Sequence, residues 1–208
     1  HPRMPMEPLI FVEVALVDEL AGSVQTLLDE SAPVFDAQRA TTAIFYSISN
    51  TQVGLRGVSF GNFLLKRVID DLQRDYPRLD TYATLSPIPG LRRWVDKHPQ
   101  ELGLVFDAEV RQRLARHWPD AGVPSVDAVQ TLLADGQWAG NERLARAMQP
   151  ALNRIAARYF LHAKAAERGE KAGGAAKPFD PVARFHLGNG ARVERINMLA
   201  DISANGFK

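Results

Sequence analysis

Apolar residues follow two different periods along the first part of the chain. Residues 9–16 (LIFVEVAL) are apolar almost throughout, which predicts a strand that is central in a sheet or buried on both faces. Residues 44–48 (IFYSI) and 81–85 (TYATL) are short β-branched and aromatic runs that are typical of further strands. Between these runs, apolar residues recur at helical spacing in residues 18–29 and 60–74. The pattern therefore predicts strands that alternate with helices.

The helix predicted at residues 60–74 has two distinct sides. Its polar side comprises Asn62, Lys66, Arg67, Asp70, Asp71 and Arg74, and its apolar side comprises Phe60, Phe63, Leu64, Val68, Ile69 and Leu72. Because the two sets fall on opposite sides of a helix, we expect the apolar side to pack on the sheet.

Helical patterns dominate after residue 90. The predicted helices cover residues 91–98, 106–118, 126–133 and 139–161. Residues 167–177 (ERGEKAGGAAK) are small and polar, which predicts a mobile loop. A further strand is expected at residues 192–199, after a tight turn at residues 188–190. We therefore interpret residues 1–208 as one α/β (α+β) domain with a helical insertion at about residues 91–170.

Composition narrows the range of functions. The 208 residues are 46% hydrophobic and 24% charged, and 25 Lys and Arg face 24 Asp and Glu. A net charge of +1 gives no global reason to expect a nucleic-acid or membrane partner. No apolar run approaches the roughly 20 residues of a membrane span. The chain has no cysteine, which excludes disulfides, zinc–thiolate sites and cysteine nucleophiles.

A glycine-containing loop separates the strand at residues 44–48 from the helix that follows. A strand, a loop and a helix N-terminus in this order direct backbone N–H groups at an anion such as a pyrophosphate. The glycines at positions 54, 57 and 61 fit neither a Walker loop nor a Rossmann fingerprint. Residues 56–61 (RGVSFG) resemble the Gln/Arg-x-x-Gly-x-Gly/Ala loop of the acetyltransferase (GNAT) fold, with Ser59 at the first motif glycine. An ordinary strand-to-helix turn is the alternative.

Two polar residues stand in unusual surroundings. Ser86 directly precedes the rigid sequence Pro-Ile-Pro-Gly, so its hydroxyl is well placed for a directed hydrogen bond, although a simple turn or cap is the alternative. His186 lies between the small polar tract and the turn, where it is either a chemical group or a half-buried structural histidine. No second histidine or carboxylate lies at metal-ligand spacing from His186.

Three stretches together resemble the malonyl-CoA decarboxylase family. They are FYSISNTQVGLRGVSFGNFLLKRVIDDLQ, TLSPIPG and DPVARFHLGNGARVERINMLAD, and the resemblance extends from about Pro8 to Lys208. It implies a catalytic domain of the GNAT-like acetyltransferase fold with a mixed central sheet. It also implies a separate N-terminal helical oligomerisation domain that is absent from this chain, and assembly as a homotetramer.

The resemblance further implies a substrate and a site. The substrate is malonyl-CoA and the products are acetyl-CoA and CO2, in fatty-acid and malonate metabolism, with no metal or organic cofactor. Ser86 and His186 are the implied catalytic and substrate-binding residues, with Ser86 accepting a proton and His186 donating one to the enolate carbon. The implied coenzyme A-binding residues are Arg56, Gly57, Val58, Ser59, Phe60, Gly61 and Asn62. A cytoplasmic location is expected because no targeting segment is visible.

Two other functions remain open from the sequence. One is a GNAT-fold acyltransferase that passes an acyl group from coenzyme A to an amine, with His186 as general base. The other is a non-catalytic coenzyme A-binding module. Only a decarboxylase consumes malonyl-CoA without an acceptor, and a binding module leaves it intact.

Overall fold

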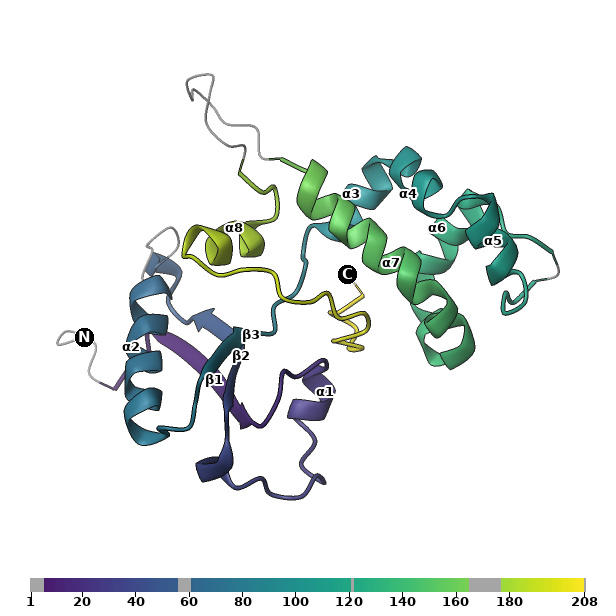
Figure 1. Cartoon of the computed structure of the whole chain (residues 1–208). Coiled ribbons are helices and arrows are strands. Elements are labelled where there is room, and N and C mark those ends of the chain that lie inside the picture. Colours follow the sequence, from purple (N-terminus) through teal and green to yellow (C-terminus); the bar gives the residue numbers. More distant parts are fainter. Residues whose placement is uncertain (1–5, 56–60, 121, 165–176, 208) are drawn as a thin grey trace, which may run out of the picture. The chain divides into compact units, whose positions relative to one another are not determined.

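The computed structural model describes residues 6–55, 61–120, 122–164 and 177–207 (Figure 1). The chain divides into two compact units, residues 1–86 and residues 87–208. Each unit has its own buried apolar cluster. The boundary falls close to residue 91, where the helical insertion was predicted to begin.

The first unit is built on a small mixed sheet. Its strands are β1 (Ile10–Val17), β2 (Thr42–Asn50) and β3 (Thr81–Thr84), in the order β1-β2-β3. The β1 strand is antiparallel to β2, whereas β2 and β3 are parallel. This mixed sheet with flanking helices confirms the predicted α/β class and is consistent with a GNAT-like core.

The prediction that the first strand is central or doubly buried was wrong. Within the described part of the chain, β2 is the middle strand and β1 pairs on one side only. On β1, Phe11 is 53% exposed and Glu13 is also exposed. Buried sheet residues come instead from β2, where Ala43, Ile44 and Phe45 are all nearly inaccessible. A continuous apolar run therefore did not distinguish an edge strand from a central one.

Helix α2 (Gly61–Asp75) connects the parallel strands β2 and β3. Its buried side consists of Leu65, Val68, Ile69, Leu72 and, just beyond its end, Tyr76, which pack with Ala43, Phe45 and Leu79. Phe63 was predicted on this side but is 74% exposed. A helix turns about 100° per residue, which places Phe63 about 160° from Leu65. Phe60 lies outside the described residues.

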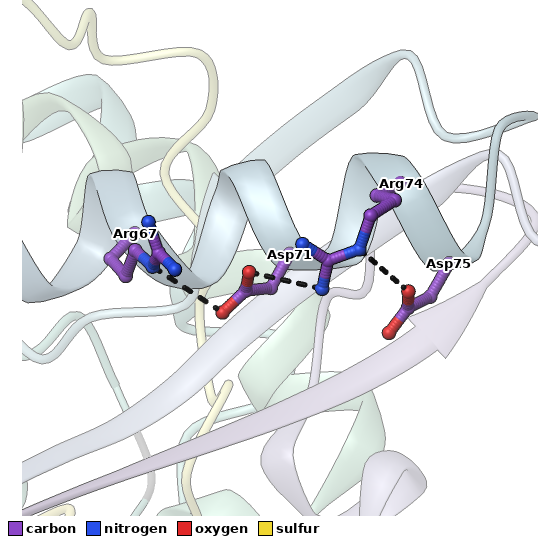
Figure 2. A network of polar contacts seen from close by, with 4 residues as sticks. All are labelled: Arg67, Asp71, Arg74 and Asp75. Atoms are coloured by element: carbon purple, nitrogen blue, oxygen red, sulfur yellow. Dashed lines mark hydrogen bonds and ion pairs between the residues drawn. The ribbon is translucent and has the colours of Figure 1, made fainter.

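The opposite face of α2 carries charges, as predicted (Figure 2). The Asp71 carboxylate pairs with two arginines, through Oδ2 to Arg67 Nε at 3.8 Å and through Oδ1 to Arg74 Nη2 at 3.1 Å. Arg74 Nε also lies 3.3 Å from Asp75 Oδ1. All four side chains are substantially exposed, so solvent screens these ion pairs and they add little to stability.

Short elements complete the first unit. They are α1 (Val24–Leu27) and the 3-10 turns η1 (Ala37–Arg39) and η2 (Val53–Leu55). The helix predicted at residues 18–29 is thus reduced to one turn. Ser23 caps α1 by accepting a hydrogen bond from the Thr26 amide, which fixes the helix start well after residue 18.

The second unit consists mainly of helices. Its elements are α3 (Leu91–Lys97), α4 (Pro99–Val105), α5 (Ala108–Leu114), α6 (Val126–Asp135), η3 (Gln137–Gly140), α7 (Glu142–His162) and α8 (Pro181–Gly188). The helix predicted at residues 106–118 is shorter than expected, because Asp107 caps α5 at its start and α5 ends at Leu114. The helix α4 was not predicted, although Pro99 occupies its first position, which suits proline.

A deep apolar cluster holds these helices together. The longest helix, α7, contributes Leu144, Met148, Ala151, Ile155 and Tyr159, each at most 2% exposed. The other helices pack their apolar residues around it. The predicted helix at residues 139–161 corresponds to α7 with the preceding η3 turn.

The C-terminal predictions are only partly correct. The turn at residues 188–190 is present, and Gly190 adopts a φ of 87° that favours glycine. The strand predicted at residues 192–199 was wrong, since this segment has no regular structure and Val193 is 52% exposed. A segment forms a strand only where a partner supplies hydrogen bonds, and no strand pairs with this one among the described residues. The predicted mobile loop lies outside the described residues, apart from Lys177.

Candidate active site

The predicted coenzyme A loop precedes the N-terminus of α2. Residues Arg56 to Phe60 lie outside the described residues, whereas Gly61 and Asn62 are the first two residues of α2. The strand β2 ends at Asn50, so the predicted order of strand, loop and helix is confirmed. A helix of 15 residues presents free N–H groups and a positive dipole end at its start, which suits a pyrophosphate.

Ser86 leaves the sheet on the same side as this loop. It lies two residues beyond β3, and the Leu85 amide still donates a hydrogen bond to the Phe45 carbonyl at 3.0 Å. Because β2 and β3 are parallel, their carboxyl ends point toward the same edge of the sheet. Ligands of α/β sheets bind at this edge. Ser86 is half-buried there and is the last residue of the first unit.

His186 lies in the second unit, near the end of helix α8. This helix was not predicted from the sequence. The imidazole is half-buried and meets the Phe185 ring edge-on, with centroids 5.0 Å apart. Burial lowers the pKa of His186, so its ring is mainly neutral near pH 7. A neutral imidazole has one N–H donor and one acceptor nitrogen.

The two predicted catalytic residues therefore belong to different units. Each lies in a setting that suits a directed polar group: Ser86 at a sheet edge and His186 on a capped helix. Their pairing around one substrate stays a prediction.

The sequence analysis missed two buried polar residues next to α8. Asp180 is 2% exposed and caps α8, and it accepts a hydrogen bond from the Tyr159 hydroxyl at 3.2 Å. The sequence contained one signal for this helix, because Asp followed by Pro is typical of an N-cap and first helical position. No sequence pattern indicated Tyr159.

Other features of the described residues lie away from the predicted site residues. Within residues 6–55, 61–120, 122–164 and 177–207, no group of three or more His, Asp or Glu could hold a metal ion. An open hollow near the start of α7 is lined by His117, Glu142, Arg143, Arg146 and Ala147. None of the predicted site residues lines it.

No described helix is both long and apolar enough to cross a membrane.

Comparison with known proteins gives consistent results. Residues 1–208 match the family model of the malonyl-CoA decarboxylase C-terminal domain. The chain is 39% identical over 215 residues to the mitochondrial malonyl-CoA decarboxylase of Anser anser anser, covering 100% of this chain and 40% of that protein. The rat enzyme, also named mitochondrial, is 39% identical, with 41% of its length covered.

Solved structures agree with the sequence relatives. The malonyl-CoA decarboxylase of Agrobacterium vitis has a TM-score of 0.75 and 44% identity, covering 99% of this chain and 45% of that one. The enzyme of Rhodopseudomonas palustris has a TM-score of 0.72 and 42% identity, covering 99% and 42%. The chain thus spans about two fifths of the length of the relatives it matches. Since the family model matches it from end to end, the chain belongs to the malonyl-CoA decarboxylase family and corresponds to its C-terminal domain.

Proposed function

We propose that this chain is the catalytic part of a malonyl-CoA decarboxylase, which converts malonyl-CoA to acetyl-CoA and CO2. The observation that carries the proposal is the match of the whole chain to the family's C-terminal domain. The strand–loop–helix order before α2 supports a coenzyme A site, with residues 56–62 on the pyrophosphate. The mixed sheet, which is consistent with a GNAT-like core, supports the same site.

The reaction needs orientation and charge stabilisation. The bond between the α-carbon and the malonyl carboxylate breaks, CO2 leaves, and the electron pair moves into the thioester carbonyl to form an enolate. One proton from solvent is then added to the α-carbon. A rigid site accelerates the first step by holding the carboxylate out of the thioester plane and by donating hydrogen bonds to the developing oxyanion. The thioester is itself the electron sink, so the proposed chemistry requires no metal or organic cofactor.

Ser86 and His186 are proposed to surround the malonyl group. The Ser86 hydroxyl is held at the carboxyl edge of the sheet, where it would orient the malonyl group by donating a hydrogen bond to it. The N–H of neutral His186 would donate to the oxyanion. His186 would take up the solvent proton and pass it to the enolate carbon, because a protonated histidine of lowered pKa is a stronger acid.

The wider properties of the protein follow from the same proposal. We expect a homotetramer and a role in fatty-acid and malonate metabolism. The cytoplasm is the expected compartment of this protein, although the goose and rat relatives are named mitochondrial.

The test is acetyl-CoA formation from malonyl-CoA, without any acceptor, by the complete protein. We expect Ser86→Ala and His186→Asn to lose about 10²-fold or more in kcat while still binding coenzyme A. The matched control is His162→Asn, which changes an exposed histidine at the end of α7 and should leave the rate unchanged.

Two results would contradict the proposal. If malonyl-CoA is bound but consumed only when an amine is added, the chain is an acyltransferase. If it is bound and never consumed, the chain is a coenzyme A-binding module. Activity that survives both site substitutions would refute the assignment of Ser86 and His186 alone.

A further inference from the structure

Asp180 is a buried carboxylate, and both of its oxygens accept hydrogen bonds. Its Oδ1 atom accepts hydrogen bonds from the amides of Val182 at 3.0 Å and Ala183 at 2.9 Å, at the first turn of α8. Its Oδ2 atom accepts from the Tyr159 hydroxyl at 3.2 Å. A carboxylate that is 2% exposed is tolerated only with such partners, and the positive end of α8 stabilises it further. Asp180 thus determines where α8 begins and how it is oriented.

Tyr159 holds this carboxylate from the centre of the second unit. Its ring is 1% exposed and lies 5.4 Å from the Trp94 ring and 6.4 Å from the Phe179 ring, between centroids. Burial, and then the negative charge of Asp180, raise the pKa of the Tyr159 phenol, whereas Arg93 opposes the shift. The phenol therefore stays protonated and donates to Asp180 at all ordinary pH values.

The Tyr159 hydroxyl also contacts the loop that follows Ser86. A Cβ added at Gly90 would collide with this hydroxyl, so the backbone of Gly90 lies directly against it. Gly90 ends the Pro-Ile-Pro-Gly loop and precedes α3, and Ile88 of the same loop packs on the apolar cluster around Tyr159. One hydroxyl thus contacts both the loop that continues from Ser86 and the cap of the helix that carries His186.

We propose that Tyr159 and Asp180 are positioning residues for the decarboxylation, holding α8 with His186 and the Pro87–Gly90 loop on one buried framework. The inference rests on the proposed function, since His186 must be a reacting group for its position to affect the rate. A catalytic imidazole loses much of its rate advantage when it is displaced by about 1 Å, because the reacting atoms must be aligned. Neither residue is proposed to touch the substrate.

Backbone contacts just before α8 are consistent with this role. The Phe179 amide donates to the Ala163 carbonyl at 3.0 Å, and Lys164 and Pro178 form an isolated bridge. These contacts tie the end of α7 to the residues just before Asp180. The residues that precede His186 are therefore fixed at several points, and the Tyr159–Asp180 hydrogen bond is a contact between side chains among them.

The experiment uses the complete protein and compares substitutions at Asp180 and Tyr159 with a substitution at Asp107, which caps a different helix. Tyr159→Phe removes only the hydroxyl, Asp180→Ala removes both the cap and its partner, and Asp180→Asn keeps an oxygen that can accept from the α8 amides. The matched control is Asp107→Ala, because Asp107 caps α5 in the same unit through the Val110 amide and lies on no site element.

We expect kcat to fall about tenfold in Tyr159→Phe and more in Asp180→Ala, with KM for malonyl-CoA changed less than about threefold. Asp180→Asn should recover most of the loss, and Asp107→Ala should keep the wild-type kcat. A second readout needs no turnover: ¹³C-histidine NMR, with His186→Asn to assign the signal, measures the pKa of His186. We expect Asp180→Ala to raise this pKa toward its ordinary value, because a loosened α8 hydrates the ring.

The two readouts separate the inference from the proposed function. If the wild-type protein does not decarboxylate malonyl-CoA, the proposed function fails, while the His186 titration still reports whether Asp180 fixes its surroundings. If Tyr159→Phe and Asp180→Ala reduce kcat no more than Asp107→Ala does, and the His186 pKa is unchanged, the two residues have only a structural role and the inference is overturned.

Discussion

The segment around Ser86 and the segment around His186 differ in what fixes them. Ser86 is held by the backbone on either side, because β3 ends two residues before it and Pro87 and Pro89 follow it. His186 is held through side chains that are distant in sequence, since its helix is capped by Asp180 and Asp180 is held by Tyr159, 21 residues away. Local chain stiffness therefore places one residue, and the packed core of the second unit places the other.

This difference has a consequence for substitution. A side-chain network responds sharply to the removal or displacement of one atom, because the remaining buried polar group loses its partner. A stiff backbone segment responds gradually, because each proline limits the chain independently. Substitution of Gly90 disturbs the side-chain network, whereas substitution of Pro87 and Pro89 disturbs the stiff backbone segment.

The largest loss in the free energy of unfolding is expected from Gly90→Ala. The added methyl group displaces the Tyr159 hydroxyl from Asp180, and overpacking of this kind costs roughly 1–3 kcal/mol in unfolding free energy. Urea unfolding of the wild-type and variant proteins measures the loss. In a Tyr159→Phe background the clash is partly relieved, so the second substitution should cost less there than alone. Equal costs in the two backgrounds would show that Gly90 and the hydroxyl are not coupled.

An intermediate effect is expected from Pro87→Ala combined with Pro89→Ala. Replacing proline increases the freedom of the unfolded chain and costs roughly 0.4–1 kcal/mol per site. The substitution also releases Ser86 from the extended conformation that a following proline imposes, so kcat should fall a few-fold. Pro77→Ala, which changes an exposed proline after α2, is the control. A wild-type kcat in the double variant would mean that these prolines do not position Ser86.

The smallest expected effect is a change in stability with pH that comes from the titration of His186. Burial lowers its pKa in the folded protein, so the unfolded chain binds the proton more readily. The stability gained by keeping the ring neutral is complete above about pH 6.5 and is lost as the pH falls from there through the folded pKa. Thermal unfolding of wild type and His186→Asn between pH 7.5 and 5 measures this, and we expect the wild type to lose more stability on acidification. Parallel profiles would contradict the buried, neutral imidazole.

The sequence predicted much of the first unit because its signals are local. The three strand segments and α2 were predicted close to their observed positions, since each is marked by a hydrophobic period. The phase of α2 was predicted less well, because Phe63 is apolar but lies on the exposed side. Which strand lies in the middle depends on pairing between segments, and apolar content alone cannot specify it.

The C-terminal region shows the limit of local signals. Residues 192–199 were predicted as a strand, yet they have no strand partner in the described part of the chain and stay irregular. Residues 181–188 were not predicted as a helix, although Asp180 and Pro181 are suitable start residues. An eight-residue helix is marginal in isolation, so packing and capping decide whether it forms.

Four features could be predicted from local signals in the sequence: the family, the α/β class, the order of strand, loop and helix before α2, and the candidate site residues. These follow from local periodicity and from motifs read along the chain. The tertiary structure alone decided that β2 is the middle strand, that His186 lies on a helix, and that Tyr159, Asp180 and Gly90 meet. The physical reason is that hydrogen bonds between strands and contacts in a packed core join residues distant in the chain, so no local pattern encodes them.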